Sequence, residues 1–163
     1  MLIPILSIIG KSGIGKTTLL EKLLPELTRR GYHVATIKHH AHPGFEIDQP
    51  GKDSWRYAQA GSEVVVIAAS DKIATIRKLE RELSLDDIAA GIQGVDIILT
   101  EGYKSAGKPA IEVVRAERGL EKVGDPDQII AIASDVLLKA SVPVFDLDDA
   151  VGIVDFIERR YLI

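Results

Sequence analysis

The sequence predicts an α/β fold with a doubly wound, mainly parallel sheet. Apolar, β-branched runs alternate with stretches of helical period along the chain, which is the order typical of β-α-β units with right-handed crossovers. Several of the runs are almost continuously hydrophobic, as expected of strands that are covered on both faces. A glycine-rich segment also joins the first apolar run to the first helical stretch, and loops at the carboxyl ends of such strands are where ligands bind.

The strands are expected where the apolar runs lie. In chain order they are Ile3–Ile9, His33–Lys38, Glu63–Ala68, Ile73–Arg77, Asp96–Thr100, Ala110–Arg115, Ile129–Ala133 and Val142–Leu147. The third and fourth runs are joined by Ala69-Ser-Asp-Lys72, and such a short connection favours an antiparallel hairpin. We therefore expect a mixed sheet, in which this hairpin accompanies the parallel strands.

Helices are expected between some of these strands, at about Lys16–Arg30, Asp53–Ala60, Leu85–Ala90 and Ala150–Tyr161. Gly31 and Gly61 provide C-terminal signals for the first two helices, and Ser84 is a good N-cap for the third. Pro25 lies inside the first helix and should kink it, because proline removes one backbone hydrogen bond. One face of the last helix is expected to hold Val151, Val154, Ile157 and Tyr161.

The composition fits one globular domain over residues 1–163, with 46% hydrophobic and 27% charged residues. The net charge of −4 argues against a nucleic acid or an anionic membrane as partner, since proteins that bind these carry a basic excess. The absence of cysteine excludes disulfides, thiolate metal sites and cysteine nucleophiles. The N-terminus lacks a basic region and a cleavage site, and no apolar run is long enough to cross a bilayer, so a cytoplasmic location is expected.

The segment from Gly10 to Thr17 matches the phosphate-binding motif G-x-x-x-x-G-K-[ST] at every fixed position. Its glycines allow backbone N–H groups to point at phosphate oxygens, and the following helix adds its positive N-terminus. We expect Lys16 to reach the β- and γ-phosphates and Thr17 to ligate Mg²⁺. The predicted nucleotide-binding residues are Gly10, Lys11, Ser12, Gly13, Ile14, Gly15, Lys16, Thr17 and Thr18. The expected fold is therefore that of a P-loop NTPase.

Lys11 occupies the second position of this loop. The SIMIBI class of NTPases carries a lysine at that position, which can reach the nucleotide of a partner subunit. The simpler interpretation is an exposed loop lysine that adds to the positive field around the phosphates. The sequence leaves both interpretations open.

Two carboxylates are candidates for completing a Mg²⁺ site, which needs an acid nearby, directly or through water. Glu101 falls at the C-terminal end of an apolar strand, on the sheet edge that carries the phosphate loop. Asp48 lies in the loop after the second strand, where P-loop proteins place a switch that senses the γ-phosphate. We expect Asp48 and Lys16 to carry catalysis, with Lys52 as a further cation near the phosphates. The alternatives are a surface acid for Glu101 and turn residues around Asp48, with Asp53 capping the next helix.

Three closely spaced histidines, His39, His40 and His42, follow the second strand. Imidazoles are transition-metal ligands, but no thiolate or clear carboxylate completes a set here. A phosphate or substrate contact at the carboxyl end of the strand is the favoured interpretation.

Several of these motifs together resemble the MobB family of molybdopterin-guanine dinucleotide biosynthesis adapter proteins. The resemblance rests on the loop ending Gly-Lys16-Thr-Thr-Leu-Leu, the run Asp48-Gln-Pro-Gly-Lys-Asp-Ser, the run Glu101-Gly-Tyr-Lys and the segment Ala131-Ile-Ala-Ser-Asp135. The two middle runs are much more specific than the phosphate loop, which a vast superfamily shares. The resemblance covers nearly the whole chain.

The resemblance implies a GTP-binding, slowly hydrolysing homodimer of the SIMIBI class. Such a protein would use GTP and Mg²⁺ and assist the guanylyltransferase that attaches GMP to molybdopterin, with molybdopterin itself a candidate ligand. The family pattern maps onto Lys16, Thr17, Asp48, Lys52, Asp53 and Glu101. Lys11 departs from the family pattern. The resemblance also offers Lys104 as a candidate site residue.

The sequence lacks Asn-Lys-x-Asp, the usual motif for guanine recognition. Asp135 follows the predicted strand Ile129–Ala133, so its carboxylate could accept from guanine N1 and N2. The alternative is an aspartate that caps a strand end or a helix.

Three other functions fit parts of the sequence. A small-molecule kinase would use the same loop, with Arg77 and Arg81 as lid arginines, and a metallochaperone NTPase would use the three histidines. The third function is that of a binding module, in which the bound nucleotide would have only a structural role.

Overall fold

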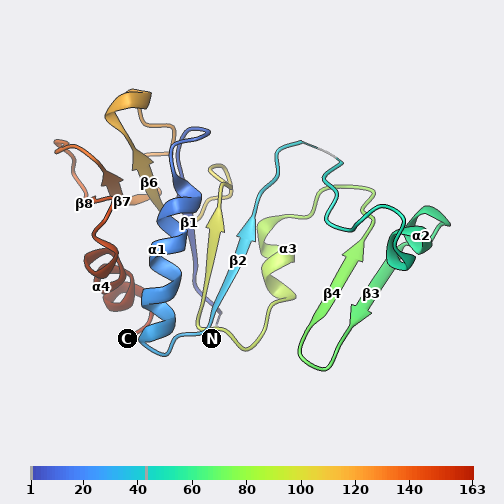
Figure 1. Cartoon of the computed structure of the whole chain (residues 1–163). Helices are drawn as coiled ribbons and strands as arrows, with labels where there is room; N and C mark the ends of the chain where they lie inside the picture. The colour runs from blue at the N-terminus through green and yellow to red at the C-terminus, as the bar shows by residue number, and fades with distance from the viewer. Residues whose placement is uncertain (1, 43) are drawn as a thin grey trace. The chain divides into compact units, whose positions relative to one another are not determined.

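A computed structural model describes residues 2–42 and 44–163 of the chain (Figure 1). These residues form two compact units. The first unit consists of the chain up to His39 together with Ser84–Ile163, and the second consists of His40–Leu83. The expectation of one domain over residues 1–163 stays a prediction.

The first unit contains a parallel sheet and the helices that pack on it. In chain order its elements are β1 (Ile5–Ile9), α1 (Lys16–Arg29), β2 (Val34–Lys38), α3 (Leu85–Ala90), β5 (Ile97–Glu101), β6 (Ala110–Val114), the 3₁₀ turn η1 (Ala116–Arg118), β7 (Ile129–Ser134), β8 (Val144–Asp146) and α4 (Ala150–Tyr161). Each corresponds to a predicted strand or helix except η1, which lies in a stretch where no regular structure was expected. Helix α1 continues through Pro25.

The strand order is β2-β5-β1-β6-β7-β8, and every neighbouring pair in this sheet is parallel. The predicted α/β class with a mainly parallel sheet is confirmed. The expectation that the hairpin would make the sheet mixed was wrong, because β3 and β4 form a separate two-stranded sheet. Since all six strands run the same way, the loops after β1, β2, β5, β6 and β7 leave from one edge.

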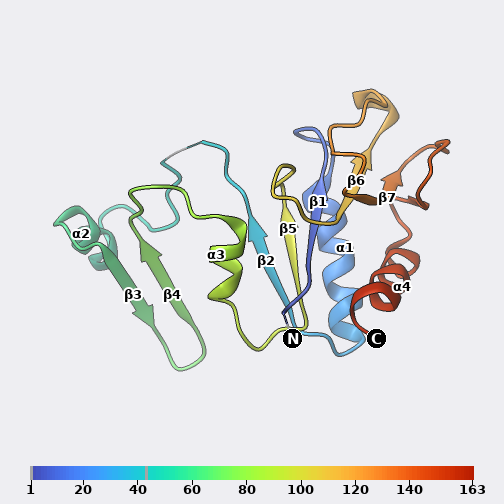
Figure 2. The same cartoon turned by 180° about the vertical axis from the view of Figure 1, so that it is seen from behind.

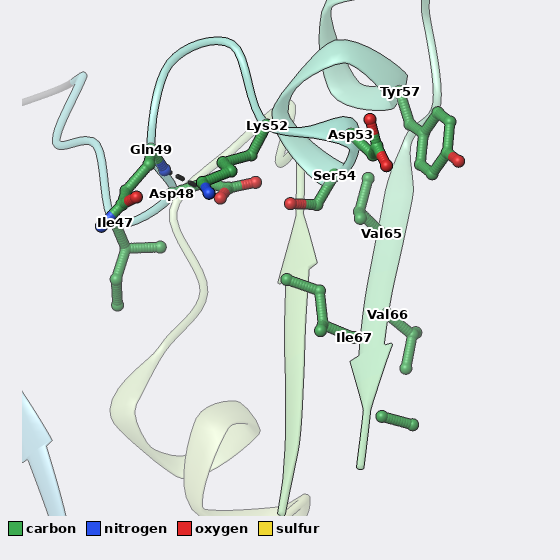
Figure 3. Close-up of a pocket in the computed structure, with 11 residues that line it drawn as sticks. Ile47, Asp48, Gln49, Lys52, Asp53, Ser54, Tyr57, Val65, Val66 and Ile67 are labelled. Carbon is green, nitrogen blue, oxygen red and sulfur yellow. Dashed lines mark hydrogen bonds between the residues drawn. The ribbon is translucent and has the colours of Figure 1, made fainter.

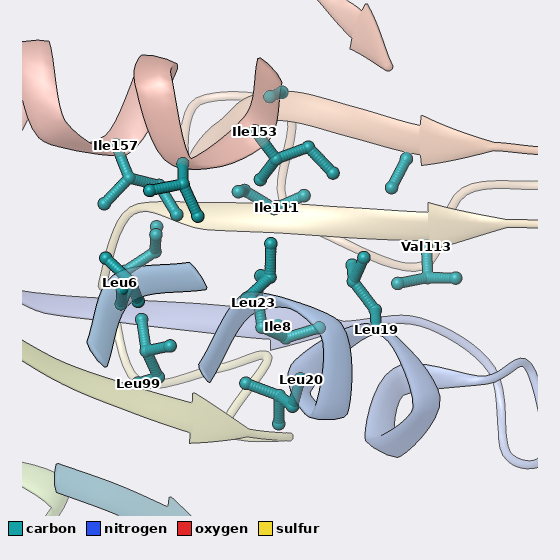
Figure 4. Packing of buried hydrophobic residues seen from close by; sticks show 14 of the residues in the cluster. Leu6, Ile8, Leu19, Leu20, Leu23, Leu99, Ile111, Val113, Ile153 and Ile157 are labelled. Carbon is teal, nitrogen blue, oxygen red and sulfur yellow. The ribbon is translucent and has the colours of Figure 1, made fainter. Parts of the chain in front are cut away.

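Helices α1 and α4 lie side by side on one face of the sheet, as Figure 2 shows from behind. Alternate strand residues point into the core between these helices and the sheet (Figure 4). The core side chains with no exposed surface include Leu6, Ile8, Leu23, Leu27, Leu99, Ile111, Ile153 and Ile157. Helix α1 is therefore fixed along its length, and the loop that precedes it is held at the sheet edge.

The opposite face of the sheet buries polar as well as apolar side chains. Ser7 and Thr100 are buried on neighbouring strands, and the Thr100 hydroxyl donates to Ser7 Oγ over 2.9 Å. Glu112 is also buried, and its Oε1 accepts hydrogen bonds from the backbone N–H groups of Val123 and Gly124. These two bonds attach the segment before β7 to this face.

The side chain of Arg30 ties the end of α1 to α4. Its guanidinium contacts Glu26 on α1 and Asp155 and Glu158 on α4, at 2.7–2.8 Å. Hydrogen bonds from Arg29 and Arg30 lower the pKa of the Glu26 carboxyl to about 2. The Glu26 carboxylate therefore stays charged at neutral pH, and the contacts of Arg30 link the two helices.

The second unit contains α2 (Asp53–Gln59) and the hairpin of β3 (Val64–Ala68) and β4 (Ile73–Arg77). The strands are antiparallel, with Val66 opposite Thr75, so the predicted hairpin is confirmed. Lys78 Nζ donates to the carbonyl oxygen of Ala58 over 2.7 Å and links the hairpin to α2. Most side chains of the hairpin are exposed; Val65 is buried.

None of the helices among the described residues has the length and apolar content that a bilayer crossing needs.

The buried face of α4 yields a test of the core. Val151 was expected on that face, but it is 55% exposed and Ile153 is fully buried in its place. Ile153→Ala should lower the free energy of unfolding by about 2–5 kcal/mol, because it leaves a cavity in the core. Val151→Ala, the matched control on the same helix, should change it by less than about 0.5 kcal/mol. Urea denaturation followed by circular dichroism measures both, and equal losses would contradict this assignment of the core.

Candidate functional site

The phosphate loop connects the end of β1 to the start of α1 at the carboxyl edge of the sheet. Gly10, Gly13 and Gly15 have φ angles of 144°, 67° and 101°, a region that favours glycine. A Cβ on Gly10 would lie 2.7 Å from the carbonyl oxygen of Val113 in β6. The loop therefore packs directly on the neighbouring strand, and the motif glycines are explained by backbone conformation and close contact.

Lys16 folds back over the loop that precedes it. Its Nζ donates to the carbonyl oxygens of Gly10 and Lys11 over 3.2 and 2.9 Å. Burial lowers the pKa of the Lys16 ammonium, while Glu101 raises it and Lys38 lowers it further. The ammonium is thus held beside the loop backbone, where it is poised to meet an anion.

Glu101 lies beside Thr17, on the sheet edge that carries the phosphate loop, and the Mg²⁺ roles of both residues stay predictions. The Thr17 hydroxyl donates to Glu101 Oε2 over 2.9 Å, and Lys38 Nζ lies 3.6 Å from the same oxygen. Glu101 is the last residue of β5, and it is paired in register with Lys38 on β2. A hydroxyl and a carboxylate at this distance are suited to a hydrated Mg²⁺, the hydroxyl as a direct ligand and the carboxylate through water.

The residues after Glu101 are fixed against the end of β2. His39 N–H donates to the carbonyl oxygen of Glu101 over 3.0 Å, and the rings of His39 and Tyr103 lie 4.7 Å apart. Gly102 has a φ angle of 92°, and Tyr103 has a φ angle of 58°, a conformation that is uncommon outside glycine. The Glu-Gly-Tyr run therefore anchors Glu101, and His39 is part of that anchor.

On the other side of the loop, Arg115 leaves the end of β6. Its Nε donates to the carbonyl oxygen of Ile14 over 2.9 Å. A Cβ on Gly15 would lie 3.2 Å from a guanidinium nitrogen of Arg115, and one on Gly13 would lie 3.5 Å from Nη2 of Arg118. Neither arginine was expected to have a role from the sequence alone. The one available signal was that Arg115 is the last residue of the predicted strand Ala110–Arg115, at the carboxyl edge.

Asp135, the sequence candidate for guanine recognition, follows β7 on this same side. Its Oδ1 accepts a hydrogen bond from the backbone N–H of Ala116 over 3.0 Å. The carboxylate thus holds the start of η1, and its side chain is exposed.

Lys11 is engaged within its own chain. Its Nζ donates to the carbonyl oxygen of Arg118 over 2.9 Å and to Glu121 Oε2 over 2.5 Å. The Lys11 ammonium lowers the pKa of the Glu121 carboxyl. A contact from Lys11 to the nucleotide of a partner subunit would require these bonds to break.

Asp48 and Lys52 lie in the second unit, where they line a pocket of about 660 Å³ (Figure 3). The wall opposite them is formed by the β3 residues Val65, Val66, Ile67 and Ala68. Asp48 Oδ1 accepts a hydrogen bond from the backbone N–H of Gln49 over 2.8 Å.

Asp53 was expected to cap α2, but the N-cap position is Lys52 and Asp53 is the first helical residue. At that position the negative carboxylate interacts favourably with the positive N-terminal end of the helix.

The histidines do not form a metal centre among the residues that the structure describes, where no group of three or more histidine, aspartate or glutamate side chains is arranged to hold an ion. His39 belongs to the first unit, whereas His40 and His42 belong to the second. His40 Nδ1 lies 2.8 Å from the carbonyl oxygen of His42.

The first unit thus brings together residues of the types that could hold a phosphate chain and Mg²⁺. The loop backbone and Lys16 lie at the carboxyl end of β1, Thr17 and Glu101 lie on the β5 side of it, and Arg115 and Arg118 lie on the β6 side. Such an arrangement binds and stabilises phosphate charge without a covalent step.

Comparisons with known proteins agree with this arrangement. Residues 5–135 match the family MobB, described as molybdopterin guanine dinucleotide synthesis protein B. The chain is 38% identical to the molybdopterin-guanine dinucleotide biosynthesis adapter protein of Haemophilus influenzae, over 96% of this chain and 89% of that protein. It is 36% identical to the adapter protein of the same name from Escherichia coli, over 96% and 92%. A crystal structure of molybdopterin-guanine biosynthesis protein B matches with a TM-score of 0.74 and 33% identity, over 95% of this chain and 98% of that one.

The close packing of Gly10 on β6 can be tested by adding a methyl group. Gly10→Ala should lower the free energy of unfolding by about 2 kcal/mol, because the new Cβ meets the Val113 carbonyl oxygen and the backbone is strained. Gly91→Ala is the matched control, since Gly91 has a φ of −83° and its Cβ would meet nothing closer than 3.5 Å. Thermal unfolding of both variants measures the difference. Equal stability of the two would contradict the geometry assigned to the loop.

Proposed function

This chain belongs to the MobB family, and from that premise we propose that it binds GTP and Mg²⁺ and assists the guanylyltransferase that attaches GMP to molybdopterin. As a family member it is an adapter protein of molybdopterin-guanine dinucleotide biosynthesis. The proposal adds the ligand, the metal and the partner enzyme, and names molybdopterin as a further candidate ligand.

The contact between Thr17 and Glu101 carries the proposal for the ligand. A complete phosphate-binding motif and a carboxylate from β5 converge here, with 2.9 Å between the hydroxyl and the carboxylate oxygen. Mg²⁺ would take the Thr17 hydroxyl and a water held by Glu101, and it would neutralise charge on the β- and γ-phosphates. Lys16 would exchange its bonds to the loop carbonyls for bonds to phosphate oxygens.

Slow GTP hydrolysis is part of the proposal. Catalysis would consist of positioning and charge stabilisation, because no nucleophilic side chain is required for phosphoryl transfer to water. We assign Asp48 as a Mg²⁺-linked or water-positioning acid and Lys52 as a cation that meets the nucleotide. Their motif, Asp-x-Pro-Gly-Lys-Asp, supports this assignment.

Asp135 is proposed to recognise guanine. Its Oδ1 accepts from Ala116 N–H, and a carboxylate can accept further hydrogen bonds at its second oxygen. Guanine presents two adjacent donors, N1–H and N2–H, whereas adenine presents an acceptor at N1. A carboxylate therefore favours GTP over ATP.

A homodimer is proposed for the assembled protein. The hairpin exposes Val66 at 54%, Ile67 at 45% and Ile73 at 70%. Apolar side chains gathered on a two-stranded sheet favour burial against another chain, and unpaired strand edges favour the same outcome.

Nucleotide preference tests the proposal directly. Isothermal titration with Mg²⁺ should show GTP binding tighter than ATP binding by about tenfold or more, because Asp135 pairs with guanine alone. Lys16→Ala should weaken GTP binding by at least about tenfold, since a charged hydrogen-bond donor to phosphate is lost. Asp135→Asn should reduce the preference for GTP. A preference for ATP would favour the small-molecule kinase, and binding that is indifferent to Lys16 would contradict a site at the phosphate loop.

The two carboxylates predict a specific dependence on Mg²⁺. Glu101→Gln and Asp48→Asn should each raise the Mg²⁺ concentration needed for GTP binding by about 10- to 100-fold, the usual cost of losing a group that orients metal ligands. Asp96→Asn is the matched control, because Asp96 lies at the other end of the same strand and accepts from the His33 backbone N–H. An Asp96→Asn effect as large as that of Glu101→Gln would show that the loss is not specific to the metal position.

A further inference from the structure

The segment from Arg115 to Glu121 is attached to the phosphate loop at three points. Arg115 Nε donates to the carbonyl oxygen of Ile14, and Lys11 Nζ donates both to the carbonyl oxygen of Arg118 and to the Glu121 carboxylate. Asp135 holds the same segment from β7 through the N–H of Ala116. An exposed connection between two strands is thus fixed along one flank of the loop.

These contacts leave the positively charged side chain of Arg118 next to the phosphate loop. Its guanidinium is exposed, and within the described residues it makes no hydrogen bond or ion pair of its own. A Cβ on Gly13 would come within 3.5 Å of its Nη2 atom. The guanidinium therefore stands beside the tip of the loop, with its donors available.

We propose that Arg118 donates hydrogen bonds to the phosphate chain of GTP bound in the same chain, and that the Lys11–Glu121 pair positions it for this contact. The inference rests on the proposed binding of GTP at the phosphate loop. It assigns Arg118 as a binding residue, and Lys11 and Glu121 as positioning residues.

The strand order supports a contact on this side of the loop. Thr17 and Glu101 lie on the β5 side of β1, so they would hold the metal on that side. Strand β6 flanks β1 on the other side, so Arg118 would add positive charge on the side opposite to the metal. Its planar guanidinium can donate two parallel hydrogen bonds to phosphate oxygens, which an ammonium cannot do.

The bonding of Lys11 supports its positioning role. Its ammonium is directed at Glu121 and at a backbone carbonyl, so its charge is already matched within the protein. The second position of the loop therefore supplies a link to η1, and the positive charge for the ligand comes from Arg118.

Titration calorimetry with GTP and Mg²⁺ tests the contact. Arg118→Ala should weaken GTP binding by about tenfold or more, as expected for the loss of a charge-assisted hydrogen bond. Arg118→Lys should recover part of that loss, because it keeps the charge but not the paired donors. Arg159→Ala removes the same charge from the last turn of α4 and should bind GTP within about twofold of the unmodified protein.

The positioning role is tested in the same titration. Glu121→Gln should weaken GTP binding by about threefold, a fraction of the loss from Arg118→Ala, whereas Glu117→Gln, an exposed neighbour on η1, should leave it unchanged. If Glu121 acts through Arg118, then Glu121→Gln should have no further effect in the Arg118→Ala protein. Additive losses would overturn the positioning role.

The two proposals fail in different ways. GTP binding to Arg118→Ala within twofold of the unmodified protein, with binding lost in Lys16→Ala, would overturn the contact and leave the proposed function standing. An equal loss of GTP binding in Arg159→Ala would also overturn the Arg118 contact, because the loss would then reflect the net charge of the protein and not a specific hydrogen bond. Full GTP binding by Lys16→Ala would contradict the proposed function itself. Thermal unfolding of each variant shows whether it is folded in these measurements.

Discussion

The close approach of the phosphate loop to strand β6 is the constraint on which the rest of the site depends. Gly10 leaves no room for a side chain against the carbonyl oxygen of Val113, so the loop is fixed to the sheet before any ligand enters. The packing of α1 against α4 and the sheet holds the other end of the loop. A loop that is held in place before phosphate binds meets a condition for strong electrostatic stabilisation, which requires donors that are fixed in advance.

Charge is divided between the two flanks of this loop. On the β5 side, one carboxylate oxygen of Glu101 faces both Thr17 and Lys38, an arrangement suited to a metal ion and its water. On the β6 side, Arg115 and Arg118 approach the loop, and Lys11 is matched by Glu121. The parallel sheet makes this division possible, because strands on both sides of β1 end at the same edge.

Sequence patterns predicted the features that depend on residues close together in the chain. Apolar runs located the strands, including the one that ends at Glu101, and the motif located the loop and Thr17. Which strands pair depends on contacts distant in the chain, so the separation of the β3–β4 hairpin from the main sheet was not predictable. Helical spacing could not choose between Val151 and Ile153, since both faces of α4 carry apolar side chains. Arg115, Arg118 and the Lys11–Glu121 pair were missed because these contacts join segments about a hundred residues apart. The roles of Asp48 and Lys52 in the second unit stay predictions.

Hydrogen–deuterium exchange with and without GTP and Mg²⁺ shows whether the nucleotide binds at the phosphate loop, because it reports backbone N–H groups one segment at a time. GTP addition should slow exchange in two segments, 10–18 and 115–121, since phosphate accepts hydrogen bonds from the loop and from Arg118 at the end of η1. Protection should be absent in Lys16→Ala. Unchanged exchange at residues 10–18, or protection confined to residues 44–83, would contradict a nucleotide site at the phosphate loop.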